Sequence, residues 1–336
     1  MAGLLAVGVA ATVAGCRSFA AIGQWAADAG QVVLAGLGAA RGAAEESTFR
    51  RVLAAVDPDR LDTVLGAWVW PRARRVGGRL VVAVDGKTVK GAGAAGHKAP
   101  HLVGALAHGL GAVLGQVAVP DRSNEIPAAR DLLRGLPDLA GAVVTFDAMH
   151  TQTSTAGLVL ARGAHYVMCV KANTPTLLRG LKALPWKDVP ASTAQTHEGG
   201  RMVRRTIKVI DAPAWVALPG AAQVAQLRRT RTLKGRKTVE VVYLVTSADR
   251  DTAPPTALAK WVNQHWHIEN KLHWVRDVTY QEDKSLVRTG NAPRVMATMR
   301  NTAISLLRLD GHDNIAWANR HHARDPARTL ALLATT

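Results

Sequence analysis

The stretch RLVVAVDGKTVKG, residues 79–91, marks a change from helical to β-strand patterning. Residues 1–75 before it are predicted to form a helical N-terminal region, with helical spacing in FAAIGQWAADAG and ESTFRRVLAAV. The apolar run in the quoted stretch is followed by two more β-rich runs, HLVGALAHG and AVLGQVAVP, with Gly-rich turns between them. This pattern predicts three sequential antiparallel strands.

After these strands, helical and strand patterns alternate. SNEIPAARDLLRGL predicts a capped helix, GAVVTFD a buried strand, TSTAGLVLARG a helix that ends at Gly163, and AHYVMCVKAN another strand. Three meandering strands followed by helix, strand, helix and strand is the order of a ribonuclease H-like mixed sheet with helices on its faces. We therefore predict an α/β fold of this class.

The later part of the chain divides by composition. Three strand-like runs, RMVRRTIKVID, AQVAQLRRTRTL and KTVEVVYLVTS, predict a β-rich insertion, and helical spacing then returns. The predicted organisation is the N-terminal region followed by a first core segment at 78–188, the insertion at 189–250, the C-terminal core helices at 251–310 and a tail at 311–336.

The charge balance points to a polyanionic partner. The chain carries 42 Lys+Arg against 25 Asp+Glu, a formal net charge of +17, which favours nucleic acid or an acidic membrane surface. Cys16 and Cys169 are its only cysteines, which argues against a disulfide framework or zinc ribbon and indicates a reducing cytoplasm. The apolar N-terminus lacks a preceding basic region and falls short of the roughly 20 residues that span a bilayer, so we expect a buried helix and no membrane partner.

Three acids occupy positions that suit metal-binding carboxylates. Asp85 follows the apolar run VVAV, and Asp147 follows VVTF. Glu269 lies in HWHIENKLHW, residues 265–274, on a predicted helix at about 100° per residue. Singly, each acid has an ordinary explanation: a hairpin turn at Asp85, a helix cap at Asp147, and a surface pair with a histidine four residues away for Glu269.

Together the acids favour a catalytic site. The first and fourth strands of a ribonuclease H-like sheet are neighbours, so Asp85 and Asp147 are expected to converge, and a helix packed across them would bring Glu269. Three carboxylates without a soft ligand suit Mg²⁺ or Mn²⁺. Two such ions, about 4 Å apart, can activate a water or a 3′-hydroxyl in phosphodiester chemistry and stabilise the leaving oxygen. We predict these three residues to be catalytic and metal-binding.

A zinc site is the competing interpretation of the same helix. His265, Glu269 and His273 are spaced by four residues on one face, yet the chain contains no HExxH motif. Zinc at this place would also leave the basic surplus unexplained.

Several of these stretches resemble one known family. AVDGKTVKGA, SNEI, TFDAMHTQ, YVMCVKANTPTL and HWHIENKLHWVRDVTYQED are similar to motifs of the ISAs-type insertion-sequence transposases, the group of the H-repeat-associated proteins. These are DDE transposases with a ribonuclease H-like core. The resemblance runs from about residue 4 to 310, and the family's catalytic acids fall on Asp85, Asp147 and Glu269.

The resemblance implies a DNA transposase that cleaves element ends and joins them to target DNA. It implies two Mg²⁺ or Mn²⁺ ions, double-stranded DNA and a homodimer in the synaptic complex, in the cytoplasm at the bacterial nucleoid. The alternatives are a non-transposing nuclease, a relic that only binds DNA, and an N-terminally truncated copy, since the chain begins inside the family's first conserved helix. The residues expected to contact DNA are Lys87, Lys171, Asn173, Arg201, Arg204, Arg205, Trp266, Asn270, His273 and Arg276.

Overall fold

The computed structural model describes residues 1–72, 79–93, 98–198 and 200–335, which form two compact units. The first unit comprises Met1–Arg74, Asp85–Pro137 and His267–Thr336, and the second comprises Arg75–Val84 and Asp138–Trp266. Strand β1 (Val81–Thr88) carries the chain from the second unit into the first. Among the described residues, no helix is long and apolar enough to cross a membrane.

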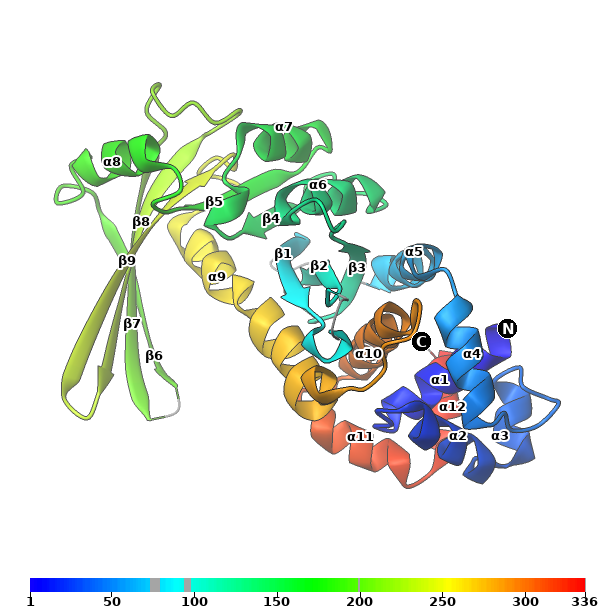
Figure 1. The fold of residues 1–336 in the computed structure, drawn as a ribbon. Coiled ribbons are helices and arrows are strands. Elements are labelled where there is room, and N and C mark those ends of the chain that lie inside the picture. The colour runs from blue at the N-terminus through cyan, green and yellow to red at the C-terminus, as the bar shows by residue number, and fades with distance from the viewer. Residues whose placement is uncertain (73–78, 94–97, 199, 336) are drawn as a thin grey trace. The chain divides into compact units, whose positions relative to one another are not determined.

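The first unit is mainly helical and is built around one long helix, α10 (Ala292–Leu309). Sixteen of its residues, Ala292–Pro293 and Val295–Arg308, are buried, because α1, α4, α5 and strand β3 all pack against it (Figure 1). The other helices of this unit are α1 (Ala2–Val13), α2 (Phe19–Asp28), α3 (Gly30–Gly36), α4 (Glu46–Ala55), α5 (Pro58–Val69), α6 (Glu125–Gly135), α11 (Ile315–Ala323) and α12 (Pro326–Thr335), with short 3₁₀ turns at Trp70–Arg72, Lys90–Ala92 and Glu282–Lys284.

Local sequence signals explain where several of these helices begin. Asp57 accepts hydrogen bonds from the backbone N–H groups at the start of α5, and Pro58 occupies its first turn. Asn124 caps α6 in the same way, through the backbone N–H of Ile126. Gly66 lets α5 approach β3 closely, because a Cβ at this position would lie 2.6 Å from the carbonyl oxygen of Leu114.

The strands follow the predicted topology. Within the first unit, β2 (His101–Ala107) and β3 (Val113–Ala118) pair antiparallel, and the order is β3-β2-β1. Within the second unit the order is β1-β4-β5-β9-β8-β7-β6, with β1, β4 and β5 parallel. The further elements of the second unit are β4 (Val143–Phe146), β5 (His165–Val170), β6 (Ala191–Glu198), β7 (Arg201–Asp211), β8 (Gln223–Leu233), β9 (Arg236–Thr246), α7 (Thr153–Ala161), α8 (Pro175–Ala183), α9 (Pro255–His265) and the 3₁₀ turn Ala148–His150.

The core of the second unit lies between its sheet and α9. Leu258 and Trp261 of α9 are 0% and 4% exposed and pack in one cluster with Val81, Val143 and Ile207 of the sheet. Burying a side chain of this size contributes roughly 1.5–3 kcal/mol. Backbone pairing of β1 with β4 thus sets the two strands side by side, and their apolar side chains are buried against α9.

The predicted α/β fold with a mixed sheet is confirmed. The strands and helices expected between residues 79 and 171 all form, and the stretch at 189–250 is β-rich. This stretch continues the sheet of its unit, because β9 pairs antiparallel with β5 from Val167↔Thr246 onward. The patterning missed α8 and the two tail helices, α11 and α12.

Two local expectations were wrong. The hairpin explanation for Asp85 fails because β1 continues through Asp85 and Gly86 to Thr88. The helix around Glu269 is not uniformly α-helical: residues Ile268–His273 and Val275–Thr279 are π-helical. Each π turn has i→i+5 hydrogen bonds and is wider than an α turn, so a face assigned at 100° per residue does not hold here.

Asp62 provides a test of the packing between α5, β3 and α10. Its side chain is 6% exposed and accepts hydrogen bonds from Thr298 Oγ1 at 2.7 Å and Gln116 Nε2 at 3.5 Å. Burial raises the pKa of this carboxyl from 3.8 to about 7, and the hydrogen bonds and Arg294 offset only part of that shift. The folded state therefore binds the Asp62 proton more tightly than the unfolded chain, and this contribution to stability is lost as the pH rises from about 4 through 7.

We predict that Asp62→Asn removes this pH dependence. Asparagine can still accept the Thr298 hydrogen bond but never carries the buried charge, so the variant should gain on the order of 2 kcal/mol relative to the parent between about pH 5 and pH 7.5. Denaturant unfolding of both proteins across this range measures the difference. A constant difference in stability between the two proteins would show that Asp62 does not titrate in this range.

Candidate functional site

Asp85 stands where β1 changes from apolar to polar. The four residues before it, Val81 to Val84, are each 0% exposed, whereas the Asp85 side chain is 33% exposed. The next residue, Gly86, has no side chain, and the carboxyl group of Glu125, at the start of α6, lies against its backbone. A Cβ on Gly86 would lie 2.4 Å from Glu125 Cδ. The Asp-Gly pair thus places one carboxylate on the strand and leaves room for a second beside it.

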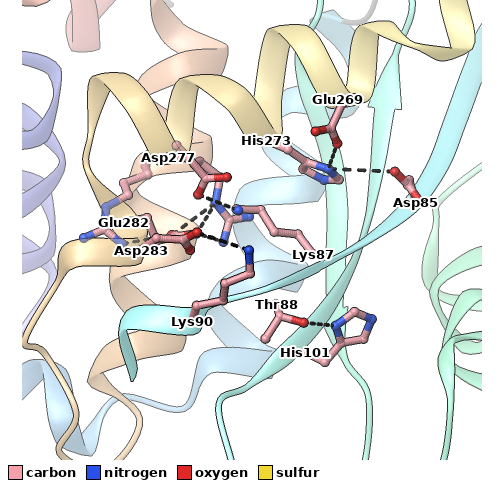
Figure 2. Close-up of polar contacts among 12 residues, drawn as sticks. Asp85, Lys87, Thr88, Lys90, His101, Glu269, His273, Asp277, Glu282 and Asp283 are labelled. Carbon is pink, nitrogen blue, oxygen red and sulfur yellow. Dashed lines mark hydrogen bonds and ion pairs between the residues drawn. The ribbon is translucent and has the colours of Figure 1, made fainter. Parts of the chain in front are cut away.

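The π-helical segment supplies the partners of Asp85. His273 Nδ1 lies 3.0 Å from Glu269 Oε2 and 3.8 Å from Asp85 Oδ2, and Figure 2 shows the imidazole between the two carboxylates. The His273 side chain is only 6% exposed, while that of Glu269 is 52% exposed. One ligand atom from each of the three residues can be chosen so that all lie within 4.8 Å of one another, which is a spacing that could hold a metal ion.

The two carboxylates have opposite electrostatic surroundings. Burial raises the pKa of Asp85, and the charges of Glu125 and Glu269 raise it further against the opposing effect of His273. The hydrogen bond from His273 lowers the pKa of Glu269, and the charges of Lys87 and Lys90 lower it further. Asp85 therefore lacks enough positive charge nearby, which a divalent cation would supply. The carboxylate oxygens and this deficit fit Mg²⁺ or Mn²⁺.

The lysines next to the site are committed to other acids. Lys87, predicted as a DNA contact, has a 7% exposed side chain, and its Nζ lies 2.5 Å from Asp277 Oδ1. Lys90 lies 3.6 Å from Asp283 Oδ2 (Figure 2). Lys87 therefore acts on the site through its charge, and the structure does not offer it as a surface contact.

Glu125 and His101 belong to the site but were missed from the sequence. His101 Nδ1 lies 2.7 Å from Thr88 Oγ1 and its Nε2 lies 2.7 Å from Glu125 Oε1, so the imidazole connects β1 to α6. From the SNEI stretch only the start of a helix could be predicted. The Asn124 cap indicates where the helix begins, but it does not indicate which residues the following Glu125 contacts.

Arg276 was predicted to contact DNA, and the structure places it elsewhere. It is 1% exposed, and its Nη2 lies 2.8 Å from Oε2 of the fully buried Glu282. Arg300 of α10 binds the other carboxylate oxygen at 2.9 Å. Arg276 thus fixes the end of the π-helical segment and has no surface to offer a nucleic acid.

Asp147 belongs to the second unit and directly follows β4. Lys171 Nζ donates a hydrogen bond to its Oδ1 at 2.8 Å, and Asn173 Nδ2 donates to the carbonyl oxygen of Ala148 at 2.7 Å. Burial alone would raise the pKa of Asp147, but the Lys171 hydrogen bond and charge lower it. Among the described contacts, the Asp147 side chain makes no cap hydrogen bond, and α7 begins only at Thr153, so the helix-cap explanation is not supported.

The zinc interpretation finds no support. His265 Nδ1 lies 2.9 Å from Thr145 Oγ1 within the second unit, and burial lowers the His265 pKa to about 4. Among the described residues, the metal-capable group that contains Glu269 and His273 has Asp85 as its third member.

The remaining predicted DNA contacts differ in exposure. Trp266 is 52% exposed, and Asn270, Lys171, Asn173, Arg201 and Arg204 are also exposed. Arg205 is half-buried and donates to Thr196 Oγ1 at 2.8 Å. His273 is buried between the carboxylates, so the structure favours a positioning role for it.

Comparisons with known proteins agree on one family. The family model described as "Transposase DDE domain" matches residues 76–306, and a second, described as "DDE_Tnp_1-associated", matches residues 1–69. "Putative transposase YncI" of Escherichia coli O157:H7 is 30% identical over 279 residues, covering 78% of this chain and 70% of that protein. "H repeat-associated putative transposase YhhI" of Escherichia coli K12 is 30% identical over 282 residues, covering 78% of this chain and 73% of that protein.

Among solved structures, the chain is similar to the piggyBac transposase in a synaptic complex with hairpin DNA. The TM-score is 0.47 at 11% sequence identity, over 99% of this chain and 73% of that one.

The site can be tested by metal binding before any reaction is measured. We predict that Asp85→Asn and Glu269→Gln each weaken Mn²⁺ binding by about tenfold or more, because each removes a charged oxygen ligand. Affinity should also fall as the pH is lowered, since the raised pKa of Asp85 makes its carboxylate protonate early. Isothermal titration at several pH values measures both effects. Asp283→Asn is the matched control. An equal loss of Mn²⁺ affinity in that variant would show that the metal does not bind at Asp85.

Proposed function

The chain belongs to the transposase DDE domain family, and on that premise we propose that it cleaves DNA at the ends of an insertion sequence and transfers the cut strand into target DNA. The single observation that carries the proposal is the placement of Asp85 and Glu269 about one buried histidine, where ligand atoms of all three lie within 4.8 Å.

We propose Asp147 as the third carboxylate of the same site. The support comes from the register of parallel strands β1 and β4, whose last paired residues are Val84 and Phe146. Asp85, still within β1, and Asp147, directly after β4, are the residues that follow these two in the chain. Carboxylates at equivalent positions on adjacent parallel strands are suited to share metal ions.

Each side chain has a role in this scheme. Asp85, Asp147 and Glu269 would hold two Mg²⁺ or Mn²⁺ ions, which when bound supply activation of a water or 3′-hydroxyl and stabilisation of the leaving oxygen. His273 orients Glu269 through the 3.0 Å hydrogen bond and so keeps its second oxygen available. Lys171 holds the Asp147 carboxylate and keeps it ionised.

The proposed DNA contacts are those predicted residues that are exposed. Lys171, Asn173 and Asn270 would contact the DNA backbone, and the exposed ring of Trp266 would pack against the DNA. The proposed partners are double-stranded element ends and target DNA, held by a homodimer in the synaptic complex.

Strands β7 and β8 offer a second basic surface. Arg204 pairs with Thr230 and Arg228 pairs with Thr206, so the two arginines are diagonal neighbours on one face and both are exposed. Arg205 lies on the opposite face, with the buried Ile207 and Leu227. The pair most suited to phosphates is therefore Arg204 with Arg228.

We predict that Glu269→Gln retains DNA binding while cleavage and strand transfer fall by orders of magnitude, because the amide keeps the size of the side chain but loses the charge that holds metal. A labelled-end assay with Mg²⁺ measures cleavage and joining separately. Asp283→Asn, whose carboxylate faces Lys90, is the matched control and should retain activity. Cutting without joining in the parent would indicate a nuclease, and binding without cutting would indicate a relic.

We predict that Arg204→Ala with Arg228→Ala weakens binding to all DNA sequences alike and reduces the slope of log K against log salt by about 1–2, because each lost phosphate contact removes nearly one released counterion. Fluorescence anisotropy at several salt concentrations measures this. Arg50→Ala with Arg51→Ala removes the same charge from exposed positions on α4 and should change the slope much less. Identical salt slopes in the two double variants would show that Arg204 and Arg228, on β7 and β8, do not contact DNA.

A further inference from the structure

The C-terminal tail, whose patterning suggested nothing, contains a second cluster of metal-ligating side chains. Asp310 and His312 lie in the turn between α10 and α11, and His322 lies near the end of α11. One ligand atom from each of the three can be chosen so that all lie within 4.8 Å of one another. The cluster lies wholly within the first unit, and none of its residues takes part in the site at Asp85.

The geometry of the cluster is close to a coordination sphere. His312 Nε2 lies 3.1 Å from Asp310 Oδ2, and the rings of His312 and His322 stand perpendicular with centroids 6.1 Å apart. Ligand atoms bound tetrahedrally to zinc at about 2.0–2.1 Å are roughly 3.3 Å apart. Small side-chain rotations would therefore bring all three donors to one ion.

His322 is the observation that ordinary packing leaves unexplained. The side chain is 4% exposed, and within the described part of the chain neither ring nitrogen has a hydrogen-bond partner. A buried polar atom without a partner costs about 1–3 kcal/mol. A metal ion on one nitrogen would remove much of this cost.

The turn that carries His312 is held in place independently. Arg308 Nη1 donates to the carbonyl oxygens of His312 and Asp313, at 3.2 and 2.7 Å. Trp317 packs beside the cluster, with its ring 5.5 Å from that of His312 and stacked at 5.3 Å on that of His321. The donors thus lie on a fixed turn and on a helix. The protein therefore holds them in place before a metal ion binds.

We propose that Asp310, His312 and His322 bind a Zn²⁺ ion that pins the end of α11 to the end of α10. Two imidazoles and one carboxylate form a donor set that zinc accepts and that is less suited to Mg²⁺, which prefers oxygen alone. A water molecule fills the fourth position. The ion is structural, and its binding is separate from the metal requirement of the transposition chemistry.

Zinc binding is measured on the untagged 336-residue chain after treatment with EDTA, by competition with a chromogenic zinc chelator. Asp85→Asn with Glu269→Gln is used as the parent, so that the other metal-capable group does not contribute. We expect this parent to bind one Zn²⁺ ion and its melting temperature to rise on zinc addition. His322→Phe and Asp310→Asn should each lower zinc affinity at least about 100-fold and abolish the rise.

The variants separate metal binding from folding. His322→Phe replaces an unpartnered buried ring with an apolar one and should be at least as stable as the zinc-free parent, and the Asp310 side chain is 47% exposed, so its substitution leaves the core intact. His321→Ala removes the adjacent histidine, which lies outside the ligand set, and should bind zinc like the parent. Retained zinc affinity in both His322→Phe and Asp310→Asn, or no bound zinc in the parent, would overturn the proposal.

Discussion

The first unit depends on one buried carboxylate, that of Glu282. It is 0% exposed and accepts hydrogen bonds from Arg276 on both oxygens and from Arg300 on Oε1, so that the segment after the π-helical turns is tied to α10. Burial alone would raise the pKa of Glu282, and the two guanidinium groups lower it despite that burial. Removing one partner from such a group costs about 3–5 kcal/mol, because a charge is then left buried and uncompensated. Glu269 and His273 are positioned by a helix whose far end is fixed in this way.

The charges around the candidate site follow a consistent pattern. Lys87 is paired with Asp277 and Lys90 with Asp283, so the nearby lysines are neutralised by acids that lie outside the metal-capable group. This leaves Asp85 beside Glu269 and Glu125, whose charges raise its pKa, with the buried His273 imidazole opposing them. A fully neutralised site would have little affinity for a divalent cation. The arrangement instead retains an unbalanced negative charge where the backbone makes room for it, at Gly86.

Much of the fold and part of the site could be predicted from the sequence, for identifiable reasons. The apolar runs at 81–84 and 143–146 each lie in a strand and are each followed directly by an acid, so their patterning gives both the element and the position of the carboxylate. The π-helical turns could not be foreseen, since apolar spacing is interpreted at the α-helical period. The role of Arg276 was missed because its partners, Glu282 and Arg300, are defined by packing and have no sequence signature.

Glu125, like Arg276, acquires its role through its neighbours and has no sequence signature of its own. Its helix, α6, begins there because Asn124 caps it, and the carboxylate is then held by His101, which also contacts Thr88 on β1. The glutamate is therefore restrained from two sides before any ligand arrives. Glycine at position 86 leaves space for that carboxylate, since a Cβ there would lie 2.4 Å from Glu125 Cδ and the glutamate side chain would have to shift. The Asp-Gly pair that patterning interprets as a turn instead accommodates a contact between β1 and α6. The charges of Glu125 and Glu269 both raise the pKa of Asp85, and a bound cation would stabilise these carboxylates.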